Sequence, residues 1–165
     1  MTNPVRDAGL STLSYVRNLL YEMLQTIPAG EMLRQPSAGA NHPLWIVGHL
    51  AVGDDQIRSA LGGGQAHLPE KWVKMFGTGS TPTSQSDAYP PYDEVHRALT
   101  ESRQRLLDWF EGMSDDDLRR PLPESWQGFA PTYGALISAL AAHEALHVGQ
   151  LSVVRRSLGL KPVEM

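Results

Sequence analysis

Two histidines and a glutamate near the C-terminal end of the chain could bind a metal ion. They belong to the pentapeptide HEALH, which places His143 and His147 four residues apart and Glu144 between them. Side chains four apart on a helix are neighbours, about 6 Å apart at Cβ, so both imidazoles can reach one ion. On a helix they would also share a face with leucines and valines, and burying them without partners would cost several kcal/mol. The pattern therefore favours a divalent metal ion as their partner.

The same pentapeptide matches the H-E-x-x-H signature of zinc proteases, in which Glu144 would be the general base. The surrounding sequence does not fit that class. The motif lies on the last expected helix, Glu164 is the sole acidic residue after it, and no strand-rich segment precedes it to hold an extended peptide. Because five-residue motifs often match by chance, we do not favour a metalloprotease.

His49 is the third candidate metal ligand. It lies on another expected helix among Trp45, Ile46 and Val52, so it also faces inward. Three imidazoles would leave the remaining position of the ion to water or substrate, which is the open arrangement of catalytic sites. Imidazole ligation suits zinc, nickel or ferrous iron and does not distinguish among them. In the alternative interpretation, the histidines or their metal only hold the helices together and the protein is not an enzyme.

Glu144 has three possible roles. It could carry a proton in catalysis, or it could accept a hydrogen bond from a ligand imidazole. It could instead form an ion pair with Arg103 or another arginine of the helix bundle. The sequence does not choose among these roles.

Four further residues are candidates for substrate binding, with a purely structural role as the alternative for each. They are Trp45, Trp126, Tyr133 and Gln150, the last of which lies about one helical turn beyond His147. The other three histidines, His42, His67 and His96, are expected to be ordinary surface residues.

The spacing of apolar residues predicts an all-α protein with four long helices. We expect them at residues 7–27, about 44–61, from Tyr92 or Asp93 to about 113, and 133–158, with short helical turns near 69–76 and 115–120. Residues 62–91 are rich in glycine and proline and long for a connection. Such a crossover would let the second and third long helices run parallel, which requires a return of roughly 25–30 Å.

Composition limits the class of protein. The 165 residues suit a single domain over 1–165, and no internal repeat is present. The net charge of -4 without a basic block argues against binding to nucleic acid or acidic membranes. The absence of cysteine excludes disulfides, thiolate ligands and a cysteine nucleophile. Since no apolar stretch approaches about 18 residues, we predict a cytoplasmic protein.

Two segments, WIVGHLAVGDDQI around His49 and HEALHVGQLSVVRRSLGL from His143, resemble the DinB/YfiT-like family of metalloenzymes. The resemblance implies a four-helix bundle of up-down-down-up order with residues 62–91 as its long crossover. It also implies a metal site made by His49, His143 and His147. Relatives include S-transferases and a maleylpyruvate isomerase that use mycothiol or bacillithiol. The resemblance therefore implies thiol-dependent transfer or isomerisation of a small molecule, with a low-molecular-weight thiol as cofactor; a metal-dependent hydrolase is the alternative.

The opposite face of the last expected helix carries small residues. They are Ser138, Ala142, Ala145, Gly149 and Ser152. Small side chains allow two helices to approach closely. We therefore predict a homodimer through this face; the alternative is that the first helix or residues 114–131 cover it.

Overall fold

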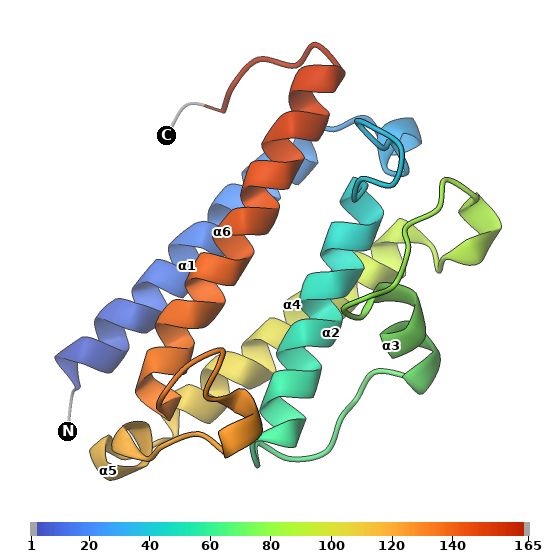
Figure 1. Ribbon diagram of the computed structural model, residues 1–165. Helices are drawn as coiled ribbons and strands as arrows, with labels where there is room; N and C mark the ends of the chain where they lie inside the picture. The colour runs from blue at the N-terminus through green and yellow to red at the C-terminus, as the bar shows by residue number, and fades with distance from the viewer. Residues whose placement is uncertain (1–2, 164–165) are drawn as a thin grey trace.

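The computed structural model describes residues 3–163, and within that range the chain is all-helical, with six α-helices and no strand. The all-α class is confirmed, whereas Glu164 lies outside the described residues. The helices are α1 (Pro4–Gln25), α2 (Pro43–Ala60), α3 (Glu70–Phe76), α4 (Tyr92–Glu111), α5 (Asp115–Arg119) and α6 (Tyr133–Ser157), shown in Figure 1. Three short 3-10 turns lie in the connections, at Ala29–Glu31, Ser86–Ala88 and Glu124–Trp126.

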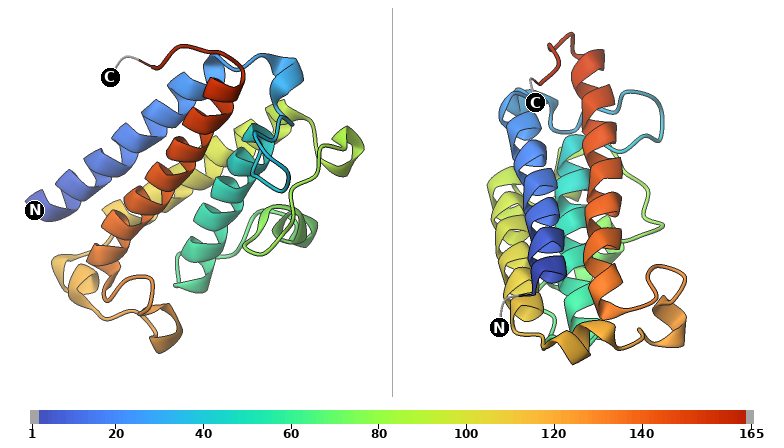
Figure 2. Two further views of the ribbon diagram at one scale, coloured as in Figure 1. Left: turned by 45° about the horizontal axis from the view of Figure 1, so that its top comes forward. Right: turned by 90° about the vertical axis from the view of Figure 1, so that its left-hand side faces the viewer.

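The four long helices form two packed pairs (Figures 1 and 2). In one pair α1 packs along α6, and in the other α2 packs along α4. The short helices cover the outside, because α3 packs on α2 and α5 packs on α6. Contacts between α2 and α6 join the two pairs, so the two helices that carry the candidate ligands are neighbours.

A layer of charged side chains divides the apolar core into two clusters. The cluster that we call upper includes Leu20, Val52, Leu99 and Val148. The cluster that we call lower includes Leu13, Leu106 and Ala141, and Ile57 of α2 packs against it, so each long helix reaches both clusters.

Between the two clusters, each long helix contributes one buried charged residue. These residues are Arg17 on α1, Asp54 on α2, Arg103 on α4 and Glu144 on α6. We call them the charged layer. His143 directly precedes Glu144, which places the candidate ligands close to this layer.

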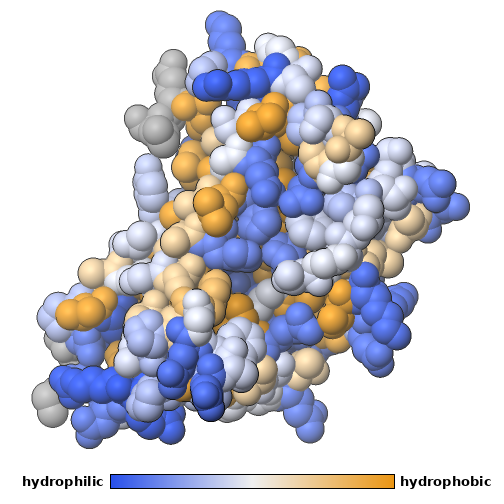
Figure 3. All heavy atoms as spheres, viewed as in Figure 1, coloured by the Kyte–Doolittle hydropathy of each residue, from blue (hydrophilic) through white to orange (hydrophobic). Residues whose placement is uncertain are grey.

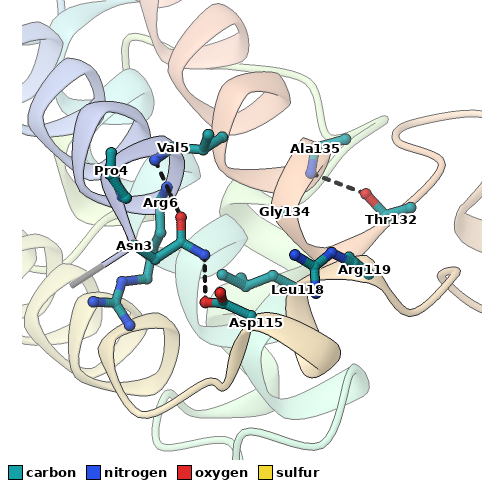
Figure 4. Close-up of a pocket in the computed structure, with 10 residues that line it drawn as sticks. All are labelled: Asn3, Pro4, Val5, Arg6, Asp115, Leu118, Arg119, Thr132, Gly134 and Ala135. Carbon is teal, nitrogen blue, oxygen red and sulfur yellow. Dashed lines mark hydrogen bonds between the residues drawn. The ribbon is translucent and has the colours of Figure 1, made fainter. Parts of the chain in front are cut away.

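The first helix begins three residues earlier than predicted because its N-terminus is capped. The side chain of Asn3 accepts hydrogen bonds from two backbone amides of the first turn, and Pro4 occupies the first helical position. Asn3 also donates to Asp115 of α5 at 2.6 Å (Figure 4). At the N-cap of the neighbouring helix α6, the Thr132 side chain accepts a hydrogen bond from the amide of Ala135 at 3.2 Å. These contacts fix the ends of α1, α5 and α6 around one surface pocket.

The prediction that His42 is a surface residue is wrong. Its side chain is fully buried, and its Nδ1 accepts a hydrogen bond from the Trp45 amide at 3.0 Å at the N-cap of α2. The ring of Tyr89 packs edge-on against it, with the centroids 5.1 Å apart. Burial lowers the pKa of His42 to about 4, so the imidazole is neutral and can accept the amide proton at neutral pH. His67 is exposed and His96 is half-buried.

The small-residue face of α6 lies at the surface of the chain. Ser138, Ala142, Ala145 and Gly149 are exposed, so neither α1 nor residues 114–131 cover them. Two larger apolar side chains, Leu146 and Val153, lie on the same helix and are also exposed. A dimer through this face stays a prediction.

Hydrophilic residues run down the middle of the face on which α6 and α2 meet (Figure 3). Over the described part of the chain, the helices are too short or too polar to cross a bilayer. A cytoplasmic location stays a prediction.

Candidate metal centre

The side chains of His49, His143 and His147 converge between α2 and α6. Their closest ring nitrogens all lie within 4.8 Å of one another. The Nε2 atom of His143 lies 3.4 Å from Nε2 of His49 and 3.3 Å from Nε2 of His147. The structure therefore brings together the three ligands predicted from the sequence.

The other ring nitrogens of two of these histidines have hydrogen-bond acceptors that orient them. Nδ1 of His49 donates to the backbone carbonyl of Phe76 at 2.8 Å. Nδ1 of His147 donates to Oε1 of Gln150 at 3.0 Å, and the same oxygen accepts from Asn41 at 3.0 Å. A neutral imidazole that donates through Nδ1 has its lone pair on Nε2. The lone pairs of His49 and His147 therefore face His143.

The three imidazoles are in the protonation state that metal binding needs. Burial lowers the pKa of all three, and for His147, where the neighbouring imidazoles add to burial, to about 4. A tetrahedral ion with metal–nitrogen bonds of about 2.0–2.1 Å separates its ligand nitrogens by about 3.3–3.4 Å. The two Nε2 separations at His143 have this value. The residues fit a divalent cation, which would also remove the repulsion between facing lone pairs.

Two aromatic side chains hold His49 in place. The Trp45 ring stacks on the imidazole, with centroids 4.6 Å apart and an interplanar angle of 9°. The Phe76 ring packs directly on Gly48 of α2, where a Cβ atom would collide with the ring. Because of this close approach, the end of α3 lies against α2 and the Phe76 carbonyl reaches His49. Trp45 therefore packs against a candidate ligand and is not among the residues that line the cavity described below.

Glu144 belongs to the charged layer and not to the imidazole cluster. Its carboxylate is fully buried, with Oε1 accepting from Nε of Arg17 and Oε2 accepting from Nη2 of Arg103 at 2.6 Å. Asp54 accepts from Arg103 at 2.8 and 3.0 Å and from Arg17 at 3.2 Å. Of the three roles considered for Glu144, these contacts match the ion pair with Arg103 or another arginine of the bundle. Its role as a proton carrier stays a prediction, which these contacts do not favour.

The charged layer is electrically balanced, with two guanidinium groups and two carboxylates. Burial disfavours the charge on Arg17, but Asp54 and Glu144 outweigh this and raise its pKa above the ordinary value. Because the four side chains come from four different helices, their hydrogen bonds fix the positions of α2 and α6 relative to each other. The network thereby sets the distance between His49 and the two histidines of α6.

A cavity of about 370 Å³ opens in front of two of the ligands, His49 and His143. Trp126, one of the predicted substrate-binding residues, lines it together with Phe129. Tyr133 lies elsewhere: its ring packs against Trp109 in the lower apolar cluster, and its hydroxyl donates to the Leu61 carbonyl at 3.4 Å. Gln150 lies behind His147 as a hydrogen-bond partner.

The sequence interpretation missed four residues that shape the site: Arg17, Asp54, Phe76 and Phe129. Arg17 had a detectable signal, because it lies at helical spacing between Leu13, Leu20 and Leu24 on the buried face of α1. Asp54 likewise lies at an inward position of α2. Phe76 acts through its carbonyl oxygen and Phe129 from a loop, so neither had a sequence pattern to reveal it.

The fold and the site together define a helical protein with a three-histidine cluster that could bind a metal ion. The chain belongs to the DinB superfamily, whose sequence pattern matches residues 12–151. The matched range contains all three histidines as well as Glu144 and Gln150. A comparison with curated proteins finds no match. The match to residues 12–151 confirms the DinB-like family predicted from the two segments around His49 and His143.

Proposed function

We propose that this protein is a divalent-metal-dependent enzyme that transfers or isomerises a small molecule with the help of a low-molecular-weight thiol. The observation that carries the proposal is the convergence of three neutral imidazole nitrogens beside a cavity that reaches the surface. The cavity reaches His49 and His143, whereas the Trp45 ring stacks on His49 and the Gln150 amide accepts a hydrogen bond from His147. An open coordination position is typical of catalytic sites rather than of structural ones.

His49, His143 and His147 would hold the ion, and Phe76 and Gln150 would keep two of the rings oriented toward it. A divalent metal would supply a Lewis acid that lowers the pKa of a thiol or water molecule in the cavity. Trp126 and Phe129 would shield the reacting group from bulk water. In the transfer step the thiol sulfur forms a bond to an electrophilic carbon, the leaving group departs with its electron pair, and the thiol proton passes to solvent.

The enzyme proposal is tested by thiol conjugation to 1-chloro-2,4-dinitrobenzene, in which chloride is the leaving group. The metal-free protein would be loaded in turn with zinc, nickel and ferrous iron and assayed with 2-mercaptoethanol and with bacillithiol. We expect at least a tenfold acceleration with one of the metals and none with His147→Ala. No acceleration with any metal would contradict thiol transfer, and hydrolysis of 4-nitrophenyl acetate instead would favour the hydrolase.

The proposal includes the bundle in the up-down-down-up order predicted from the sequence. The order of the apolar clusters along the helices supports it: α1 and α6 start in the lower cluster, whereas α2 and α4 start in the upper one. Residues 61–91, which include α3, would then be the crossover between the parallel helices α2 and α4.

The proposal also keeps a homodimer through the small-residue face of α6. Its support is the exposure of this face together with Leu146 and Val153. Light scattering at micromolar concentration would give twice the chain mass of 18.1 kDa. The mass of a single chain, found for both the wild type and Gly149→Lys, would contradict the dimer.

A further inference from the structure

Gly53 lies in the interior of α2, although no contact among the described residues requires a glycine there. Its backbone is helical, since the positive φ angles of the described chain occur at other glycines. A Cβ atom added at Gly53 would meet no atom within 4 Å. Glycine is the least favourable helix residue apart from proline. Alanine at this position should therefore stabilise α2.

Gly48 on the same helix provides the contrast. There a Cβ atom would collide with the Phe76 ring, so close packing inside the protein explains the glycine. Gly53 comes four residues after His49, on the same side of the helix. It lines the cavity in front of His49 and His143. The space that a side chain at Gly53 would fill is thus the space beside the candidate metal centre.

The residues around this space select the chemistry of its occupant. Two aromatic rings, those of Trp126 and Phe129, form part of the wall. The Phe129 ring lies edge-on to His143, with the ring centroids 6.3 Å apart, and the residue is 40% exposed. An exposed phenylalanine next to a buried polar cluster offers a surface for another flat, apolar group.

The remaining lining residues are Ile57 and three neutral hydrogen-bonding side chains, Gln56, Thr78 and Ser125. Within residues 3–163, no carboxylate, lysine or arginine lines this cavity. A positively charged group would lose hydration there without gaining an ionic partner. An uncharged group would lose much less hydration free energy on entering the cavity.

We propose that Gly53 keeps open a binding site for an uncharged aromatic group of the substrate, which packs against Trp126 and Phe129 beside His49 and His143. This inference rests on the proposed function, because it names the substrate class of the same site. The cavity volume of about 370 Å³ accommodates a single substituted ring. A side chain in place of Gly53 would accordingly reduce the size of the group that the site accepts.

The experiment fills the space stepwise with Gly53→Ala and Gly53→Leu. Thr12→Leu, at an exposed position of α1, is the control for an added leucine on a helix surface. The probe is benzyl alcohol, titrated into the metal-free protein and followed by the amide NMR shifts of residues that line the cavity. Benzylammonium, which has the same ring and a positive charge, is the charged comparison.

We expect benzyl alcohol to shift the amides of Gly53, Thr78 and Ser125 in the wild type and in Thr12→Leu. Gly53→Leu should weaken this binding at least tenfold, Gly53→Ala less, and benzylammonium should bind the wild type at least tenfold more weakly. Equal binding of benzyl alcohol to the wild type and Gly53→Leu would overturn the inference, as would no shifts at these amides in the wild type.

Metal content, measured on the same preparations, separates this inference from the proposed function. We expect Gly53→Leu to bind as much metal as the wild type, because its side chain fills the cavity and not the ligand positions. Probe binding without any metal binding would contradict the proposed function and leave the aromatic site standing. Metal binding with identical probe affinities in all variants would overturn the aromatic site alone.

Discussion

Removing one member of the charged layer should destabilise the protein much more than removing a balanced pair. Arg103 donates to both oxygens of Asp54, at 2.8 and 3.0 Å, and to Glu144 at 2.6 Å. Arg103→Met would leave two buried carboxylates facing only Arg17. Breaking a buried ion pair in this way costs about 3–5 kcal/mol. Asp54→Leu should cost a similar amount, because it leaves two buried guanidinium groups with one carboxylate.

The double variant Arg103→Met/Asp54→Leu keeps the balanced pair of Arg17 and Glu144. We therefore expect it to be at least about 2 kcal/mol more stable than the sum of the two single losses predicts. Urea unfolding followed by far-UV circular dichroism at pH 7 gives the four free energies of unfolding. If a single variant is unfolded without urea while the double variant is folded, the two losses are likewise not additive.

The matched control is the exposed ion pair between Arg119 and Asp116, whose side chains are 73% and 97% exposed. The same substitutions there should show no measurable coupling, since exposed pairs contribute little. Additive losses in the buried pair, within about 0.5 kcal/mol, would refute the reasoning that the layer acts as one balanced network.

Three further predictions concern single residues around the site. Gly48→Ala should destabilise the protein by about 1–3 kcal/mol in urea and weaken metal binding, because the Phe76 ring and carbonyl must move; unchanged affinity would contradict this coupling. Gln150→Leu should weaken zinc binding about 10–100-fold in competition with a chelator, without unfolding the protein. The pKa of His42 is about 4 in the folded protein, below its value in the unfolded chain. The stability that the neutral imidazole contributes is therefore present at pH 7 and is lost as the pH falls from about 6.5 to 4, because the unfolded chain binds the proton first. His42→Asn keeps an acceptor for the Trp45 amide and should lose about 2 kcal/mol less stability over that range in pH-dependent urea unfolding; identical pH profiles would exclude His42 as the cause.

The parts of the site that lie on long periodic helices were predictable from the sequence. His49, His143 and His147 each occupy an inward position of a strongly apolar helix, so their convergence followed from helix geometry. The beginning of α1 was missed by three residues because the cap, Asn3, precedes the first apolar position.

The roles of residues that depend on tertiary contacts were not predictable in this way, even where the spacing indicates an inward position. The inward position of α1 between Leu13 and Leu20 is filled by Arg17, whereas the neighbouring apolar residue Val16 is only partly buried. Charge favours the surface for an arginine unless its partners are known, and those partners lie on three other helices. His42 was misassigned for a similar reason, since only the folded connection shows that it is buried and caps α2.

The central claim is that His49, His143 and His147 bind one divalent metal ion. The most direct test is elemental analysis of the untagged wild-type protein and of the three single alanine variants, each also after incubation with zinc, nickel and ferrous iron under exclusion of oxygen. We predict about one equivalent of metal per chain in the wild type and loss of that metal in all three variants, which should remain helical by circular dichroism. A wild-type protein that stays metal-free after incubation, or variants that retain a full equivalent, would contradict the account.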